Sequence, residues 1–213
     1  MAGCCDPRGC ERMFGARFAR HVATRYRRRG LDPAARRMVD FLAGDGVRGA
    51  SVLEIGGGIG EIGVELLKRG ADQVTTLELS TAYDGEARRL AEEAGVADRM
   101  HRKVTDIATS PDDVEPADLV VLHRVVCCYP DYARLLGAAA DHCRNRLAFS
   151  HPPRNVISRL VLATQNATFA VLGREFRTFA HPPAAMVGVV VGQGMRAVMA
   201  HPGRIWQVEG LTR

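Results

Sequence analysis

The chain has 213 residues, of which 46% are hydrophobic and 25% charged, a composition typical of one globular domain with a sizeable core. No stretch approaches 18 consecutive apolar residues, which excludes a transmembrane helix by sequence, and the first residues lack the apolar segment of a secretory signal. We therefore expect a cytoplasmic protein, in which the six cysteines are thiols or metal ligands rather than disulfides.

The net charge of +5 is unevenly distributed along the chain. Residues 1–37 contain 10 Arg and Lys against 3 Asp and Glu, and residues 144–213 contain 9 against 2. The middle, residues 38–143, contains 10 against 19 and is acidic. Two basic ends fit an anionic substrate or a nucleic acid. A soluble protein with many surface arginines would show the same distribution.

The N-terminal residues 1–46 are expected to form a Cys-containing loop and a helical cap, ahead of a main domain at 47–213. The loop offers three soft metal ligands, one short of a closed zinc site. The alternative is a set of unligated thiols. The candidate ligands are Cys4, Cys5 and Cys10, with Cys127, Cys128 or a histidine as the fourth.

Two helices are expected within this cap. Residues 11–29 have an apolar or aromatic residue at every fourth position, which indicates an amphipathic helix that Gly30 ends. Asp32 followed by Pro33 is typical of the start of a second helix, with Asp32 as its N-cap. The stripe of the first helix consists of Phe14, Phe18, Val22 and Tyr26. The first three of these are expected to pack on the domain.

A strand, a glycine-rich turn and a helix follow. Residues 52–55 form a short apolar run typical of a buried parallel strand, and residues 61–69 have helical periodicity. Four of the five residues between Gly56 and Gly60 are glycines, which permit a tight turn and close approach of a ligand. The spacing does not match the dinucleotide pattern G-x-G-x-x-G. It matches an acidic residue followed by alternating glycines: Glu54, Gly56, Gly58 and Gly60.

This pattern resembles motif I of the class I S-adenosylmethionine-dependent methyltransferases. The resemblance implies S-adenosylmethionine as the cofactor, and Glu54 suits a ligand that carries an ammonium group. Glu78 ends the next apolar run, where a carboxylate can accept both ribose hydroxyls. Asp106 ends the third run, where the family carries an acidic residue facing the adenine amine. A Rossmann-like domain for another nucleotide is the alternative.

The cofactor-binding residues that the resemblance implies come from five segments of the chain. They include Tyr26, because N-terminal tyrosines line the cofactor pocket in similar methyltransferases. The full set is Tyr26, Glu54, Gly56, Gly58, Gly60, Glu78, Leu79, Asp106, Ile107 and His123.

The rest of the chain alternates between strands and helices and ends in a predicted antiparallel hairpin. This order predicts an α/β protein with the Rossmann-like seven-stranded class I methyltransferase sheet, helices on both faces and a C-terminal hairpin. The remaining strands are expected at 100–104, 118–123, 146–150, 195–200 and 204–209. The helices are expected at 84–94, 131–142, 155–172 and 182–191.

The second half of the chain is similar to the magnesium-protoporphyrin O-methyltransferases. The similarity lies in Tyr129-Pro130 after the fourth strand, in residues 146–153 and in the segment Arg177-Thr-Phe-Ala-His181. The chain departs from that subfamily where an acceptor would lie. Cys128 replaces a histidine, and Arg124 replaces an acidic residue.

Methyl transfer is an in-line displacement at an activated carbon, so the protein mainly has to align donor and acceptor. A carboxylate acceptor is already ionised and needs arginines, whereas a hydroxyl acceptor needs a base. We expect a methyltransferase acting on a small, anionic metabolite, with O-methylation favoured. The arginine candidates are Arg124, Arg154 and Arg177, and the other catalytic candidates are His123, His151 and Tyr129, with His181 from the C-terminal match.

Two other functions stay open. An RNA methyltransferase would use the basic ends as its phosphate-binding surface. A thiol-rich protein would bind S-adenosylmethionine or a metal ion without turnover. No membrane partner is expected, and the sequence does not indicate an oligomeric state.

Overall fold

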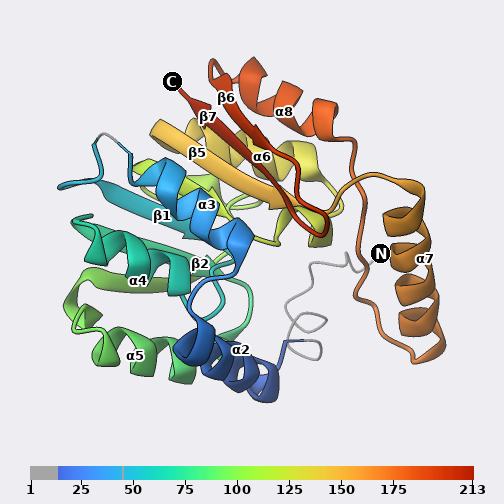
Figure 1. The fold of residues 1–213 in the computed structure, drawn as a ribbon, viewed down its shortest axis with the longest axis horizontal. Helices are drawn as coiled ribbons and strands as arrows, with labels where there is room; N and C mark the ends of the chain where they lie inside the picture. Colours follow the sequence, from blue (N-terminus) through green and yellow to red (C-terminus); the bar gives the residue numbers. More distant parts are fainter. Residues whose placement is uncertain (1–13, 45) are drawn as a thin grey trace.

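The computed structural model describes residues 14–44 and 46–213, which contain a seven-stranded sheet with helices on both faces (Figure 1). The strand order is β3-β2-β1-β4-β5-β7-β6. The first five strands are parallel, and β7 runs antiparallel between β5 and β6. The strands are β1 (Ser51–Ile55), β2 (Gln73–Glu78), β3 (Met100–Val104), β4 (Ala117–Leu122), β5 (Cys143–His151), β6 (Arg196–His201) and β7 (Gln207–Thr212).

The helices form two layers around this sheet. Two core clusters lie on opposite faces, because successive residues of a strand point in opposite directions. Val52 and Leu53 of β1, for example, belong to different clusters. Helices α2 (Ala16–Arg29), α3 (Pro33–Leu42), α4 (Glu61–Lys68) and α5 (Asp84–Glu93) pack on one face, and α6 (Tyr132–Asp141) and α8 (Pro183–Gly192) on the other.

Helix α7 (Val156–Val171) stands apart from the sheet at the edge of the molecule (Figure 1). Only Phe169 is buried in it, whereas Ile157 and Leu160 are 74% and 67% exposed. The chain returns from α7 to α8 through residues 172–182. Asn166 of α7 fixes the middle of this return, because its side chain accepts from the Thr178 N–H and donates to the Thr178 carbonyl.

The structure confirms the predicted seven-stranded class I architecture, including the C-terminal antiparallel pair. Strand β5 is longer than the predicted 146–150, because its neighbours β4 and β7 pair with it from Cys143 to His151. The last strand lies three residues beyond the predicted 204–209. Its register is set by β5, which pairs Arg146 with Thr212, and not by the local pattern.

Three predicted features of the cap meet different outcomes. The Asp32 side chain caps α3 as predicted, accepting from the N–H groups of Ala34 and Ala35 at 2.9 and 3.2 Å. Helix α2 begins at Ala16 in the part of the chain that the structure describes. Cys4, Cys5 and Cys10 lie outside the described residues.

No helix among the described residues has the length and apolarity needed to span a lipid bilayer.

The sheet core gives a first prediction. Phe149 of β5 is fully buried in the cluster under α6 and α8. Phe149→Ala is expected to lower the free energy of unfolding by about 3–5 kcal/mol, because it removes a ring and leaves a cavity. Denaturant unfolding followed by circular dichroism measures this. Leu160→Ala on the exposed side of α7 is the control and should change it by less than about 0.5 kcal/mol; equal losses would contradict the packing described.

Candidate functional site

A cavity of about 210 Å³ lies at the carboxyl ends of β1, β2 and β4. The strand order reverses between β1 and β4, and open α/β sheets bind their ligands at such a point. Residues from β1, the glycine turn, the ends of β2 and β4, and helix α2 line its walls.

The glycine turn forms one wall and requires glycine at three positions. Gly56, Gly58 and Gly60 have φ angles of +64°, +56° and +79°, which disfavour any residue with a Cβ. A Cβ on Gly56 would also lie 2.4 Å from Val125 Cγ2. Gly56 and Gly58 line the cavity, whereas Gly60 does not. The role of Gly60 in the structure is to begin α4 in the left-handed conformation.

Glu54 lies beneath this turn at the end of β1. It is 3% exposed, lines the cavity, and its Oε2 accepts from the Gly63 N–H of α4 at 3.2 Å. Burial raises the pKa of this carboxyl to about 8, with a further contribution from Glu61. A cationic group beside it would favour the ionised form again.

Glu78 lies at the end of β2 with one oxygen unsatisfied. The backbone N–H groups of Gly58 and Leu79 donate to its carboxylate, and burial raises its pKa to about 7. Its Oε2 is buried and has no hydrogen-bond partner among the described residues. Such an atom in a cavity wall indicates a missing donor, because buried polar atoms are normally satisfied.

Asp106 holds the far side of the cavity together. Its Oδ1 accepts from the Ala108 N–H at 3.0 Å, and its Oδ2 accepts from the Tyr129 hydroxyl at 2.9 Å. Asp106, Ile107 and Tyr129 all line the cavity. Tyr129 therefore connects the segment after β4 to the segment after β3.

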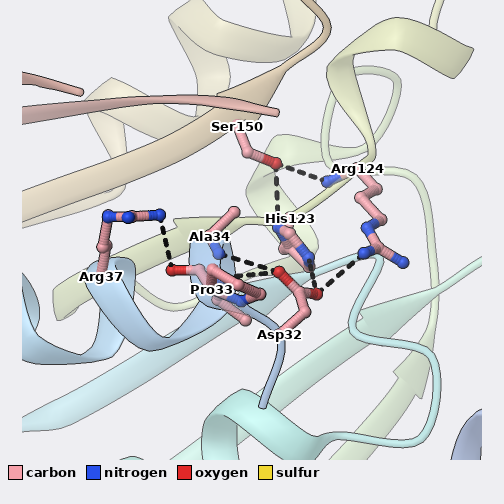
Figure 2. Close-up of polar contacts among 8 residues, drawn as sticks. Asp32, Pro33, Ala34, Arg37, His123, Arg124 and Ser150 are labelled. Atoms are coloured by element: carbon pink, nitrogen blue, oxygen red, sulfur yellow. Dashed lines mark hydrogen bonds and ion pairs between the residues drawn. The ribbon is translucent and has the colours of Figure 1, made fainter. Parts of the chain in front are cut away.

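Asp32 joins the cap to the end of β4, as Figure 2 shows. Its Oδ2 accepts from His123 Nε2 at 3.1 Å and from Arg124 Nη2 at 2.8 Å. The Ser150 hydroxyl accepts from the Arg124 N–H at 2.9 Å and donates to His123 Nδ1 at 2.9 Å. Both ring nitrogens of His123 are thus engaged, which corresponds to the neutral tautomer with its proton on Nε2.

The charges in this network are well defined. Burial lowers the pKa of His123 and outweighs the opposing effect of Asp32. Burial alone would raise the pKa of Asp32, but the hydrogen bond from His123 and the charge of Arg124 hold it well below its usual range. The network at neutral pH is therefore a carboxylate, a neutral imidazole and a guanidinium.

Arg124 is the one non-glycine residue with a positive φ among the described residues, at +61°. The guanidinium carbon lies 5.3 Å from the centre of the Trp206 ring. Arg124 lines the cavity, and its side chain is 37% exposed. Its Nε has no acceptor among the residues that the structure describes. Strained backbone conformations cluster at functional sites. Together with the unused Nε donor, the strain indicates that the side chain of Arg124 has a functional role.

The structure separates the predicted site residues into two groups. Those in the cavity wall are Glu54, Gly56, Gly58, Glu78, Leu79, Asp106, Ile107, His123, Arg124 and Tyr129. Gly60, His151, Arg177, Arg154 and His181 are not part of the wall. His151, the last residue of β5, is buried, and its nitrogens lie near Pro152 O and Glu209 of β7. Arg177 donates to the Phe176 carbonyl.

The apolar stripe of residues 14–26 has two roles in the structure. Phe14 and Val22 pack against the core as predicted, and together with Phe18 they also line the cavity. Tyr26 is predicted to contact a ligand, but its hydroxyl donates to Glu65 of α4, outside the wall. The stripe is continuous, and the packing of α2 against α5 decides which of its ends reaches the cavity.

Three further lining residues escaped the sequence analysis. Phe176, in the return from α7, is 3% exposed and contacts Phe14 edge-on at 5.1 Å. Tyr83 follows β2, and Glu61 begins α4 with a pKa raised to about 7 by burial. The position of Glu61 directly after the glycine turn was the one available signal. Phe176 gave none, because its place depends on the path of α7.

Residues 52–146 match a family of proteins described as methyltransferase domains. No curated protein matches the chain by sequence. Magnesium protoporphyrin IX methyltransferase from Synechocystis PCC 6803, solved with S-adenosylhomocysteine, is 20% identical. That alignment covers 84% of this chain and 81% of the other, with a TM-score of 0.69.

Two other solved structures show the breadth of the similarity. An O-methyltransferase family 2 protein from Planctomyces limnophilus in complex with apigenin is 22% identical, over 92% of this chain and 61% of that one, with a TM-score of 0.68. A putative RNA methyltransferase from Pyrococcus horikoshii is 12% identical over 84% of each chain, with a TM-score of 0.59. At these identities the similarity establishes the fold. Residues 52–146 match a methyltransferase domain, which supports the prediction of an S-adenosylmethionine-dependent methyltransferase, and the predicted class I fold is confirmed.

Proposed function

We propose that this methyltransferase acts on a small, anionic acceptor with an apolar body, and that the methylated atom is an oxygen. The observation that carries the proposal is the polarity of the cavity. Glu78 lies at the end of β2 and Arg124 just after β4, with β1 and its glycine turn between them. The strands that carry Glu78 and Arg124 are separated by two strand spacings of about 4.8 Å each. This separation leaves room for the methyl donor beside Glu78 and the methyl acceptor beside Arg124.

The donor fits the Glu78 side of the cavity. The unsatisfied Glu78 Oε2 is suited to a ribose hydroxyl, and Gly58 gives close access to the backbone. Asp106 and Ile107 would face the adenine, and Glu54 would favour a nearby ammonium group. S-adenosylmethionine supplies a methyl group already activated by a sulfonium, so these residues only have to hold it in line.

The acceptor fits the Arg124 side. Asp32 and Trp206 fix the guanidinium, and its Nε is an unused donor. Carboxylates are ionised at neutral pH, so an acceptor held by Arg124 needs no base. His123 is accordingly not required as a base. Both of its ring nitrogens are engaged in hydrogen bonds, so its role is to position Asp32 and Ser150.

The body of the acceptor would contact an aromatic rim formed by Phe14, Phe18 and Phe176. Phe14 contacts both other rings, at 5.5 and 5.1 Å. Aromatic side chains favour flat, apolar ligands, which stack on the rings or meet their edges. Two of the three named similar structures concern a porphyrin and a flavonoid, which are flat molecules. That agreement supports the proposal without identifying the acceptor.

The donor site gives a second prediction. Glu78→Ala should weaken binding of S-adenosylhomocysteine by about 1–3 kcal/mol, measured by titration calorimetry, because two ribose hydroxyls lose their acceptor. Glu92→Ala, an exposed carboxylate on α5, is the control and should bind normally. Equal affinity of Glu78→Ala and the unaltered protein would contradict the donor site.

The acceptor site gives a third prediction. The protein is incubated with methyl-labelled S-adenosylmethionine and a cell lysate, and label is measured in RNA, protein and small-molecule fractions. We expect label in anionic small molecules. Arg124→Gln should reduce it roughly 10- to 100-fold, as expected for losing a charged hydrogen bond, with S-adenosylhomocysteine affinity kept.

Arg177→Gln is the matched control, because Arg177 lies outside the cavity wall. Three results would contradict the acceptor proposal. Label in RNA would favour a nucleic-acid substrate bound by the basic ends. A parallel loss of S-adenosylhomocysteine affinity in Arg124→Gln would assign Arg124 to the donor. Binding without any labelled product would favour a protein that binds the cofactor without turnover.

The buried carboxyls give a fourth prediction, for the protein without ligand. Glu54, Glu61 and Glu78 have pKa values raised to about 8, 7 and 7, above about 4.3 in an unfolded chain. These carboxyls keep their protons to a higher pH in the folded state than in the unfolded state. Stability from these groups is therefore fully present below about pH 4.3 and is lost as the pH rises through 7 and 8.

The melting temperature should accordingly fall between about pH 4.5 and pH 8, with no further fall from these groups above about pH 8. Glu54→Gln, which stays neutral and keeps an acceptor for Gly63, should flatten this fall. Glu115→Gln, an exposed control, should leave it unchanged. A Glu54→Gln variant with the same fall as the unaltered protein would show that Glu54 is ionised in the folded state.

A further inference from the structure

Two adjacent cysteines lie beside the cavity, and methyl transfer does not use them. Cys127 and Cys128 belong to the short 3-10 helix η4 (Val126–Cys128), which follows β4. Their Sγ atoms are 3.6 Å apart, and each lies 3.7 Å from the carbonyl oxygen of Arg124. Cys128 lines the cavity, and Cys127 is 5% exposed. We propose that this pair is a binding site for a trivalent arsenical, or for another soft centre that takes two thiolates and one outside ligand.

The turn that carries the thiols is fixed from several sides. The Cys128 N–H donates to Val125 O at 2.8 Å, and the Phe179 N–H donates to Cys127 O at 2.7 Å. His181 Nε2 donates to Tyr129 O at 2.9 Å. The return segment from α7 thus holds η4 and the residue after it through the carbonyl oxygens of Cys127 and Tyr129. The separation of the two sulfurs is set before any ligand arrives, which reduces the entropy cost of binding.

A direct disulfide fits this geometry poorly. Consecutive Cα atoms are about 3.8 Å apart, whereas disulfides usually join Cα atoms about 4.4–6.8 Å apart. The sulfurs would also have to approach from 3.6 Å to about 2.05 Å, against the hydrogen bonds that fix the turn. A single atom bonded to both sulfurs needs no such movement, because tetrahedral zinc with bonds of about 2.3 Å separates two sulfurs by about 3.8 Å.

Zinc itself needs four ligands, and it is the less suitable occupant. No group of three or more His, Cys, Asp or Glu side chains suited to a metal ion occurs in the part of the chain that the structure describes. A trivalent arsenical needs only two thiolates, since its third substituent comes with it. The cavity beside Cys128 gives that substituent a place.

The binding step balances without a change of oxidation state. An organoarsenic(III) dihydroxide reacts with two thiols. Two As–O and two S–H bonds break, two As–S bonds form, and two water molecules leave. Attack begins from a thiolate. Cys128 lines the cavity and is the accessible thiol, and its hydrogen bond lowers the pKa of the Cys127 thiol below its usual value, which favours formation of the second As–S bond.

Cys143 is the natural comparison. It is buried on β5, its Sγ is 4.0 Å from Asp118 O, and burial raises the pKa of its thiol to about 11. A buried thiol with a raised pKa is a poor nucleophile. Cys143 therefore tests whether reactivity follows from the paired arrangement or from any cysteine of the domain.

The experiment titrates phenylarsine oxide onto the full chain and counts adducts by intact mass. Cys4, Cys5 and Cys10 are replaced by serine in every sample, because Cys4 and Cys5 are also adjacent. We expect one adduct per chain. Cys127→Ser and Cys128→Ser should each weaken adduct formation at least about 10-fold, while Cys143→Ser keeps it. Excess 2,3-dimercaptopropanol should remove the adduct, and 2-mercaptoethanol at the same thiol concentration should not.

Circular dichroism melting confirms that each variant is folded, and Cys127→Ala and Cys128→Ala replace any serine variant that is not. The proposal is overturned if no adduct forms, if either single variant keeps it, or if the monothiol removes it equally well. Adduct formation is scored without S-adenosylmethionine. Failure of the proposed methyl acceptor would therefore leave this result unaffected, and the reverse also holds.

Discussion

The carboxylate of Asp32 is the interaction on which the site depends. It accepts four hydrogen bonds, two from the first turn of α3 and two from His123 and Arg124 after β4. One side chain, 11% exposed, therefore connects the helical cap to the cavity edge of the sheet. Removing it would leave an imidazole N–H and a guanidinium without their acceptor in a largely buried place, which costs more than the bonds themselves contribute.

The cavity combines two kinds of wall for a related reason. The sheet contributes backbone and carboxylates at fixed strand ends, where parallel pairing dictates the spacing. The aromatic rim comes from α2 with the residues just before it and from the return after α7, segments more than 150 residues apart that meet through Phe14 and Phe176. The side proposed for the methyl donor is thus built from local sequence around the strands, whereas the rim proposed for the acceptor is built from contacts between distant segments. This division explains why the methyl donor is much easier to infer than the acceptor.

The same division decides how much the sequence could predict. Strand ends, the glycine turn and the capping role of Asp32 follow from local patterns, and Glu54, Glu78 and Asp106 line the cavity as those patterns imply. Period-four spacing predicted the stripe of α2 but not which end of it lies over the cavity. The sequence places His151 at a strand end, as it does His123. In the structure His151 lies on β5, one strand beyond β4, and is buried beside Glu209 of β7, a pairing that no local pattern reports.

The backbone of Arg124 has a consequence for how this position can vary. Its φ of +61° is a conformation that glycine adopts without strain, so a glycine there would relax the chain while removing the guanidinium. The same change would leave the Asp32 carboxylate without its guanidinium partner and the Trp206 ring without its cation, so relief of the strained turn and loss of these contacts act in opposite directions. The backbone strain at this position is therefore tolerated together with an ion pair that a glycine could not make.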